Sequence, residues 1–232
     1  MDCNTQPSHV RFPRRAVLSG LGLALAGAAI VGLYSTAAFT QRAQGPTEVP
    51  VDELMKTSDL PDLSLGSADA KITMVEYASM TCGHCMHFHT KVLPELKTKY
   101  IDTGKLRLIF REFPLDPRAF AASMLARCVG GDKTFALVGA LFETQADWAF
   151  VKENPKPKLF EVAKQAGFTQ ETFDKCLTDQ KLLDQLTALR VRASDVFGVS
   201  ATPSFFINGK RHLTAPTIEE FDKTLQPLLG AG

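Results

Sequence analysis

The sequence has almost no excess of charge of either sign. Its 26 lysine and arginine residues stand against 25 aspartate and glutamate residues, and the formal net charge at pH 7 is +1. A protein that binds nucleic-acid phosphates presents a basic surface, so this balance predicts no nucleic-acid partner. Cysteine is also scarce, with five in 232 residues, which excludes a small fold held together by disulfides in place of a core. The sequence shows no internal repeat or low-complexity segment.

The rest of the composition is that of a globular protein. Hydrophobic residues make up 45% of the chain and charged residues 22%, a balance that argues against general disorder. A chain of 232 residues is long enough for one large domain or two small ones.

Residues 1–38 have the pattern of an export signal. Three arginines precede Ala16–Leu33, an uncharged run of 18 residues, and small residues follow at Ser35 and Ala37. Basic residues, an apolar run and a small-x-small cleavage site in this order predict a secretory signal. Two of the arginines are adjacent, as in a twin-arginine signal. The alternative is an uncleaved membrane anchor. In both cases the folded part would work in an oxidising compartment, where disulfides persist.

Strand patterns divide the remainder of the chain. Residues 39–66 hold several prolines and glycines and are expected to form a lead-in segment, with Val49–Met55 as a candidate edge strand. Residues 67–230 are expected to form the domain itself. Within it, Ile72–Ala78 is a β-rich run suited to a central strand, and Leu106–Phe113 predicts a second strand.

Helices are predicted between and after these strands. One begins near Cys82 and continues to about Tyr100, with a kink at Pro94. Asp116 and Pro117 are suited to the N-cap and the first position of the next helix. This helix opens a helical block over about 117–197, whose predicted helices cover 119–129, 133–145, 158–166, 170–178 and 179–197.

The chain then returns to β structure. Ser204–Asn208 predicts a strand, and Asn208-Gly209 is a strong signal for a hairpin turn. Thr217 and Glu220 form a capping box that opens a final helix to about Leu229. The order of strand, helix, strand, helical block, hairpin and helix predicts an α/β fold.

The motif Cys82-Gly83-His84-Cys85 lies where the central strand passes into a helix. A thiol at a helix N-terminus meets unpaired backbone N–H groups and the positive end of the helix dipole, which lower its pKa from about 8.5 into the range of about 3.5–7.5. Cys82 is therefore predicted to be a nucleophilic thiolate, to which His84 adds positive charge or a hydrogen bond. Cys85, one turn further on, suits a resolving thiol. A stabilised thiolate favours the reduced form and makes the disulfide a stronger oxidant.

The same spacing of two cysteines also occurs in zinc sites. A structural zinc site needs two more ligands, and His87 and His89 lie nearby on the same predicted helix. A single helix points these side chains around much of its circumference, so they converge poorly on one ion. We therefore expect no metal site. Metal binding through Cys82, Cys85 and a nearby histidine is the alternative.

These residues resemble the DsbA family of the thioredoxin superfamily. The strand Ile72–Ala78, the helix that starts at Cys82–Cys85, the pair Thr202-Pro203 and the final hairpin are similar to a thioredoxin fold. The helical block is similar to the insertion of DsbA-like periplasmic thiol oxidases, and the resemblance covers residues 67–230. DsbA-like proteins often have Pro-His between the cysteines, whereas this chain has Gly-His, the pair typical of protein disulfide isomerases.

The resemblance implies roles for residues outside the motif. Pro203 matches the cis-proline that lies beside the active cysteines, where it would present the backbone of Thr202 to an extended substrate peptide. Glu76 shares a face of the central strand with apolar residues, which predicts that it is buried. It matches an acidic residue that assists proton transfer with the buried cysteine. The alternative for Glu76 is a structural pair with a residue such as Arg111.

Cys128 and Cys176 fall in the helical block, near the ends of different predicted helices. Two such thiols in an exported protein are expected to pair, and some DsbA-like proteins carry a second disulfide of this kind. The bridge would close a loop of 49 residues and contribute about 4 kcal/mol in the chain-entropy model. The alternative is two buried free thiols.

The fold expected from the resemblance is a thioredoxin fold with a helical insertion over about 117–197. The expected activity is that of a periplasmic thiol-disulfide oxidase that uses no cofactor and forms disulfides in reduced, unfolded secreted proteins. A DsbB-like membrane partner would reoxidise it. Disulfide isomerases of this superfamily usually carry a dimerisation domain, and residues 41–66 are too short for one. The expected assembly is a monomer. The alternatives are an isomerase or reductase of the same fold, and a metal-binding chaperone.

Overall fold

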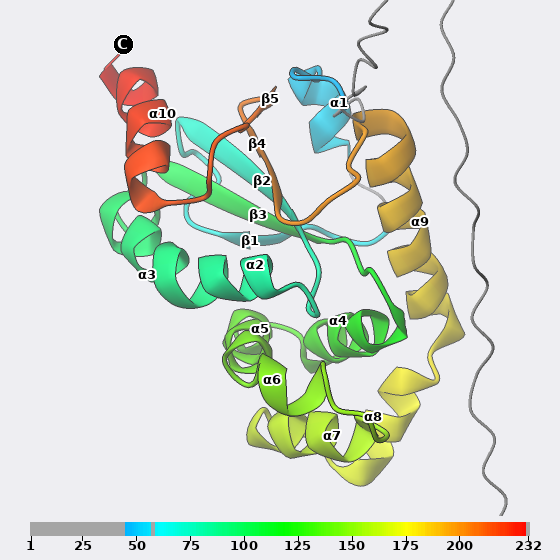
Figure 1. Cartoon of the computed structure of the whole chain (residues 1–232). Coiled ribbons are helices and arrows are strands. Elements are labelled where there is room, and N and C mark those ends of the chain that lie inside the picture. The colour runs from blue at the N-terminus through cyan, green and yellow to red at the C-terminus, as the bar shows by residue number, and fades with distance from the viewer. Residues whose placement is uncertain (1–44, 57–58, 231–232) are drawn as a thin grey trace, which may run out of the picture. The chain divides into compact units, whose positions relative to one another are not determined.

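A five-stranded mixed sheet lies at the centre of the fold (Figure 1). The computed structural model describes residues 45–56 and 59–230, so the export signal or anchor expected at residues 1–38 lies outside the described residues. The strands follow the spatial order β1-β3-β2-β4-β5. Only β2 and β3 run parallel, and the other neighbouring pairs are antiparallel. Their bounds are Leu63–Leu65 for β1, Ile72–Ala78 for β2, Leu106–Glu112 for β3, Ser204–Ile207 for β4 and Lys210–Arg211 for β5.

The two faces of β2 are both buried, which explains its nearly continuous apolar sequence. Ile72 and Met74 belong to one apolar cluster, whereas Val75 and Tyr77 belong to another. Because side chains alternate along a strand, these two sets lie on opposite faces of the sheet. The position of Glu76 on the Met74 face therefore places a carboxylate in the interior, as the sequence pattern predicts.

A long helical run covers the face of the sheet that holds Glu76. It comprises α2 (Gly83–His87), η1 (Phe88–Val92), α3 (Leu93–Leu96) and η2 (Lys97–Ile101), where η1 and η2 are wider π-helical turns. Pro94 lies in the first turn of α3, directly after η1. Proline has no N–H to donate to a preceding carbonyl, and it lies where the π-helical turn η1 passes into the α-helix α3. The final helix α10 (Ile218–Gly230) contributes Phe221 and Leu225 to the same apolar cluster.

The helical block predicted between the second and third long strands is present as an insertion between β3 and β4. Figure 1 shows α4 to α8 grouped at one end of the molecule and α9 running back from them toward the sheet. Asp116 caps α4, because its carboxylate accepts hydrogen bonds from the backbone N–H groups of Arg118 and Ala119 at 2.8 and 3.0 Å. The bounds are Pro117–Val129 for α4, Lys133–Glu143 for α5, Gln145–Trp148 for α6, Lys156–Gln165 for α7, Gln170–Leu177 for α8 and Gln180–Phe197 for α9.

A disulfide between Cys128 of α4 and Cys176 of α8 ties the insertion together. This is the bridge expected from the sequence. Between β4 and β5, the chain turns at Asn208 and Gly209, where both backbone φ angles are positive, at 46° and 84°. A two-residue hairpin needs such angles, and Asn-Gly is a preferred sequence for it.

The expected edge strand at Val49–Met55 is wrong. Val51–Met55 forms the short helix α1 instead, in which the N–H of Leu54 donates to the carbonyl of Pro50 at 2.9 Å. Within this segment Leu54 is buried, whereas its neighbours are partly or fully exposed. One buried side chain per turn is typical of a helix, whereas a strand would bury every second residue. The edge strand that precedes β2 in the sequence is β1, Leu63–Leu65, so the sheet begins before residue 67, the predicted start of the domain.

Two arginine–carboxylate pairs fasten β3 to its surroundings. Arg111 donates from Nε and Nη2 to the Asp62 carboxylate at 2.8 and 2.9 Å, and from Nη1 to the hydroxyl of Tyr77 at 3.0 Å. Arg127 of α4 donates from Nε and Nη2 to the fully buried Glu112 at 2.5 and 2.6 Å. Bidentate pairs of this kind fix orientation as well as distance. They therefore hold β1 and α4 against β3.

Candidate active site

Cys82 lies at the junction that the sequence predicts, between the end of β2 and the start of α2. It is the N-cap residue of α2, and its carbonyl accepts the first hydrogen bond of the helix from the N–H of Met86 at 3.0 Å. A turn precedes it, closed by the Cys82 N–H and the Ser79 carbonyl at 3.0 Å. The two cysteines carry free thiols, of which Cys82 is half-buried and Cys85 is buried. The accessible thiol is thus the first of the pair.

The two thiols have opposite shifts in pKa. The pKa of Cys82 is lowered to about 5, chiefly by a hydrogen bond from the Cys85 thiol, and further by Thr202 and by the backbone N–H groups of Cys85 and His84. Partial burial of Cys82 opposes this shift. The pKa of Cys85 is raised well above its usual value, first by burial, then by the hydrogen bond to Cys82 and by the charge of Glu76. At neutral pH the pair therefore holds one thiolate, on Cys82, and one thiol, on Cys85.

The contribution of His84 comes from its backbone. Its N–H is one of the donors that lower the pKa of Cys82, whereas its imidazole is exposed at the start of α2. A helix N-terminus supplies such donors whatever the side chain is. The role expected for the His84 side chain, to add positive charge or a hydrogen bond to the thiolate, stays a prediction.

The peptide bond between Thr202 and Pro203 is cis, and it lies against Cys82. The Cys82 Sγ is 3.2 Å from the carbonyl oxygen of Thr202, to which the thiol form donates. The Thr202 hydroxyl is buried and has no hydrogen-bond partner among the described residues, and the Thr202 side chain helps lower the pKa of Cys82. This hydroxyl is thus free to donate to a thiolate at Cys82.

Gln145 is a buried residue of the site that the sequence analysis missed. It begins α6 in the helical insertion, and its Nε2 donates to the carbonyls of Met80 and Cys82 at 2.8 and 3.1 Å. The loop before the redox helix is therefore held by a side chain from the insertion. No signal in the sequence marks this glutamine, because its partners are backbone carbonyls more than 60 residues away.

Glu76 is fully buried, and its partner is His89 and not Arg111. His89 Nε2 lies 3.1 and 3.0 Å from the two carboxylate oxygens of Glu76. Arg111 is engaged by Asp62, directly before β1, and by Tyr77 of β2, so the alternative of a Glu76–Arg111 pair is wrong. From the sequence alone, His89 is only a candidate metal ligand.

Within residues 45–56 and 59–230, no group of three or more His, Cys, Asp and Glu side chains is arranged to hold a metal ion. His87 is exposed, while His89 is directed to Glu76. The helices of this same part of the chain include none that is long and apolar enough to span a membrane.

A family model described as thioredoxin matches residues 58–227. A Rickettsia bellii protein with the provisional name of protein-disulfide oxidoreductase is 36% identical over 174 residues, which are 75% of this chain and 67% of that protein. The crystal structure of alpha-DsbA1 from Wolbachia pipientis has a TM-score of 0.72 at 33% identity, covering 78% of this chain and 96% of that one. The chain belongs to the DsbA-like thiol-disulfide oxidoreductases of the thioredoxin superfamily.

A second solved structure similar to this DsbA-like chain is described as a protein-disulfide isomerase from Novosphingobium aromaticivorans. Its TM-score is 0.62 at 25% identity, covering 72% of this chain and 97% of that one. The chain spans 61% of the length of a Rickettsia felis relative, so the activity and partners of the whole protein are a proposal.

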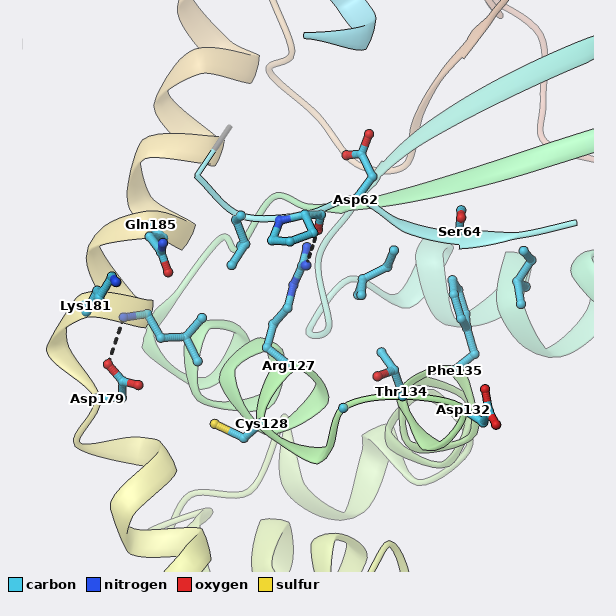
Figure 2. Close-up of a pocket in the computed structure, with 17 residues that line it drawn as sticks. Asp62, Ser64, Arg127, Cys128, Asp132, Thr134, Phe135, Asp179, Lys181 and Gln185 are labelled. Carbon is cyan, nitrogen blue, oxygen red and sulfur yellow. Dashed lines mark hydrogen bonds between the residues drawn. The ribbon is translucent and has the colours of Figure 1, made fainter. Parts of the chain in front are cut away.

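A pocket of about 860 Å³ lies on another part of this DsbA-like fold, between β1 and the ends of α4, α5 and α9. Figure 2 shows Arg127 reaching from α4 toward the β1 segment, with Asp179 and Lys181 at the start of α9 on one side. Neither redox cysteine lines this pocket, and neither do Thr202 and Pro203. Its lining is distinct from the residues of the redox site.

Proposed function

We propose that this protein is an exported thiol-disulfide oxidase that forms disulfides in reduced, unfolded secreted proteins. The single observation that carries the proposal is the contrast between the thiols, with the pKa of Cys82 lowered to about 5 and that of Cys85 raised. Stabilisation of the Cys82 thiolate favours the dithiol form of the protein. The disulfide form is then the stronger oxidant, because its reduction is more favourable.

The reaction begins with a substrate thiolate that attacks Sγ of Cys82 in the Cys82–Cys85 disulfide. The bond between the two cysteines breaks, its electron pair leaves on the Cys85 sulfur, and this sulfur takes up a proton. A second substrate thiolate then attacks the substrate sulfur of the mixed disulfide and releases Cys82 as a thiolate. Two electrons have passed from two substrate thiols to the protein. The Thr202 carbonyl lies beside Cys82, and an extended substrate peptide would bind there along the Thr202 backbone.

The pre-oxidised protein, mixed with a reduced, unfolded protein of two cysteines, tests this proposal. We expect two substrate thiols to disappear per protein molecule, and we expect no reaction with Cys82→Ala. Cys85→Ala cannot form the Cys82–Cys85 disulfide, so this variant should also leave the substrate thiols intact. A Cys128→Ala, Cys176→Ala double variant is the matched control and should react as the parent does. A fully oxidised parent protein that leaves the substrate thiols intact would refute the oxidase.

A disulfide isomerase is the second candidate. The Gly-His pair within the motif favours it, and so does the description of the Novosphingobium protein as an isomerase. The reduced protein would then recover the activity of a substrate with scrambled disulfides, without added oxidant. An oxidase with a stabilised dithiol form should do this poorly, so the two assays on one preparation separate the candidates.

Export and reoxidation belong to the same proposal. The disulfide between Cys128 and Cys176 supports an oxidising compartment, since such bridges are rare where thiols are kept reduced. We place the protein in the periplasm, exported or anchored through residues 1–38. Its reoxidation would need a DsbB-like membrane partner. Export of the folded domain, and its loss when residues 1–38 are deleted, is the measurement that tests this part.

A further inference from the structure

The turn between β2 and the redox helix is held by two side chains of the helical insertion. Figure 1 shows this turn reaching from the sheet toward α4. Gln145 donates from Nε2 to the carbonyls of Met80 and Cys82 at 2.8 and 3.1 Å. The hydroxyl of Thr81, between them, donates to the carboxylate of Asp116 at the start of α4. Three consecutive residues that end at Cys82 are thus fastened to the insertion.

Gln145 binds carbonyl groups that lie inside the protein. Met80 is 0% exposed and Gln145 is 2% exposed, so the Met80 carbonyl is shielded from water. The Cys82 carbonyl also accepts the first hydrogen bond of α2, from the N–H of Met86, and an oxygen with two lone pairs can accept both bonds. Because a buried carbonyl without a partner is unfavourable, the amide stabilises one conformation of this turn.

The helix that carries Gln145 is itself firmly held. Trp148, at the end of α6, is fully buried, and its Nε1 donates to the carbonyl of Leu141 in α5 at 2.9 Å. Arg118 of α4 donates from Nη1 to the carbonyl of Ala149 at 2.6 Å. These contacts fix α6 against α5 and α4, so a well-ordered element presents the Gln145 amide to the turn.

The surroundings of the Cys82 sulfur depend on contacts of hydrogen-bond length. Its Sγ lies 3.2 Å from the carbonyl oxygen of Thr202, and the Thr202 side chain and backbone N–H groups at the start of α2 lower the pKa of this thiol. Hydrogen bonds tolerate little displacement before they are lost. Gln145 binds the carbonyl of Cys82 itself, so it fixes the backbone from which the sulfur projects.

The two redox forms differ in what holds the Cys82 side chain. In the disulfide form, the covalent bond to Cys85 fixes the position of the sulfur. In the dithiol form this bond is absent, and only non-covalent contacts hold the Cys82 thiolate in place. The hydrogen bonds of Gln145 therefore contribute more to the dithiol form than to the disulfide form.

We propose that Gln145 is a positioning residue for Cys82, through which the helical insertion strengthens the oxidising power of the redox pair. This inference rests on the proposed oxidase function and deepens it. Gln145 contacts backbone carbonyls and no reacting atom. By favouring the dithiol form, it makes reduction of the disulfide more favourable, and the disulfide form becomes the stronger oxidant.

Trp148 provides a matched control. It lies on the same helix and also donates a side-chain N–H to a buried carbonyl, but this acceptor belongs to the insertion and not to the redox turn. The test compares Gln145→Met with Trp148→Phe in the full protein, because each substitution removes the donor and keeps an apolar side chain. Each protein is equilibrated with glutathione buffers at pH 7. Two molecules of glutathione reduce the Cys82–Cys85 disulfide to the dithiol and form one molecule of glutathione disulfide.

We expect Gln145→Met to lower the equilibrium constant of this reduction about fivefold to tenfold, the scale on which one hydrogen bond contributes. A tenfold change lowers the reduction potential by about 30 mV. The pKa of Cys82, measured by alkylation of the reduced protein, should rise in the same variant. Trp148→Phe should keep both quantities at the values of the parent, although urea unfolding should show that both variants are less stable than the parent.

A measurement on the unsubstituted protein keeps the test independent of whether Gln145→Met folds. Hydrogen exchange of the Gln145 side-chain amide is followed by NMR in the dithiol and disulfide forms. We expect slow exchange in both forms, compared with the exposed Gln165, because the amide is buried and bound to two carbonyls. Exchange in the dithiol form as fast as that of Gln165 would overturn the inference.

A folded Gln145→Met with the equilibrium constant and the Cys82 pKa of the parent, or equal changes in Trp148→Phe, would overturn it as well. These results leave the oxidase proposal standing, because that proposal fails only if the oxidised parent protein leaves the substrate thiols intact. The two failures are therefore distinguishable.

Discussion

At the scale of single residues, the reactivity of the site comes from two thiols in opposite surroundings. Cys82 is half-buried at a helix start, and the Cys85 thiol, the Thr202 side chain and backbone N–H groups lower its pKa. Cys85 is buried and faces the negative charge of Glu76. Each unit of pKa difference corresponds to about 1.36 kcal/mol between protonation states. The Cys82–Cys85 motif does not create these surroundings by itself. Thr202, before the cis-proline, acts on Cys82, and Glu76 of β2 acts on Cys85.

Alkylation of the reduced protein tests the two thiols separately. The rate of Cys82 alkylation by iodoacetamide should rise with a midpoint near pH 5, where its pKa lies, because the thiolate is the reactive form. Cys85 should remain unreacted over the same range, since its pKa is raised. Mass spectrometry of peptides measures both. A Cys82 midpoint near the pKa of about 8.5 of an ordinary thiol would contradict the account.

The stability of the reduced protein should depend on pH through the same residue. Because the folded pKa of Cys82 is lowered to about 5, its thiolate stabilises the folded state fully above about pH 8.5 and loses this effect as pH falls through about 5. Between pH 5 and pH 7 the gain is about 1–2 kcal/mol after allowing for solvent screening at a half-exposed group. Urea unfolding of the reduced protein and of Cys82→Ser measures it. A gap between them that is constant with pH would contradict the prediction.

At the scale of elements, β3 and α4 depend on a buried ion pair. Glu112 is fully buried and Arg127 nearly so. Removal of one member of such a pair leaves an uncompensated charge and costs about 3–5 kcal/mol. We expect Arg127→Leu to lower the free energy of unfolding by this amount, measured in urea. Lys164→Leu, which removes an exposed pair with Glu161, is the control and should cost about 1 kcal/mol or less. Equal losses in the two variants would show that the buried pair is not structural.

The elements differ in how far the sequence predicts them. β2, the redox helix, the helical insertion and the Asn208-Gly209 hairpin follow from local signals, namely apolar runs, an N-cap and a turn pair. The prediction of a strand over Val49–Met55 fails because a run of seven residues carries too little periodicity to separate a helix from a strand. In the structure this segment is a helix, with Pro50 as its N-cap residue and Leu54 as its buried residue.

The sequence also identifies only some residues of the redox site. Cys82, Cys85 and Pro203 are recognisable because their spacing and their neighbours carry the signal. The contacts of Gln145 and His89 are not recognisable, because each joins segments that only the folded chain brings together. The cysteines and histidines of one predicted helix make His89 a candidate metal ligand. Its partner, Glu76 of β2, is identified only in the folded structure.

At the scale of the whole molecule, the helical insertion is part of the redox site. Gln145 of the insertion holds the loop before Cys82, and Phe142 covers the imidazole of His89. The disulfide between α4 and α8 joins two helices of the insertion, and the pair between Arg127 and Glu112 holds the insertion against the sheet. The thioredoxin sheet and the insertion thus build one site together, with Cys82 at its surface and Cys85 in its interior.

The equilibrium reduction potential of the Cys82–Cys85 pair tests the central claim most directly. The protein is equilibrated with glutathione buffers at pH 7, and the fraction oxidised is measured by alkylation. Because the Cys82 thiolate stabilises the dithiol form, the account predicts a potential more oxidising than about −200 mV, in the range of disulfide-forming proteins. A potential near about −270 mV, that of thioredoxin, would contradict it and make the protein a reductant.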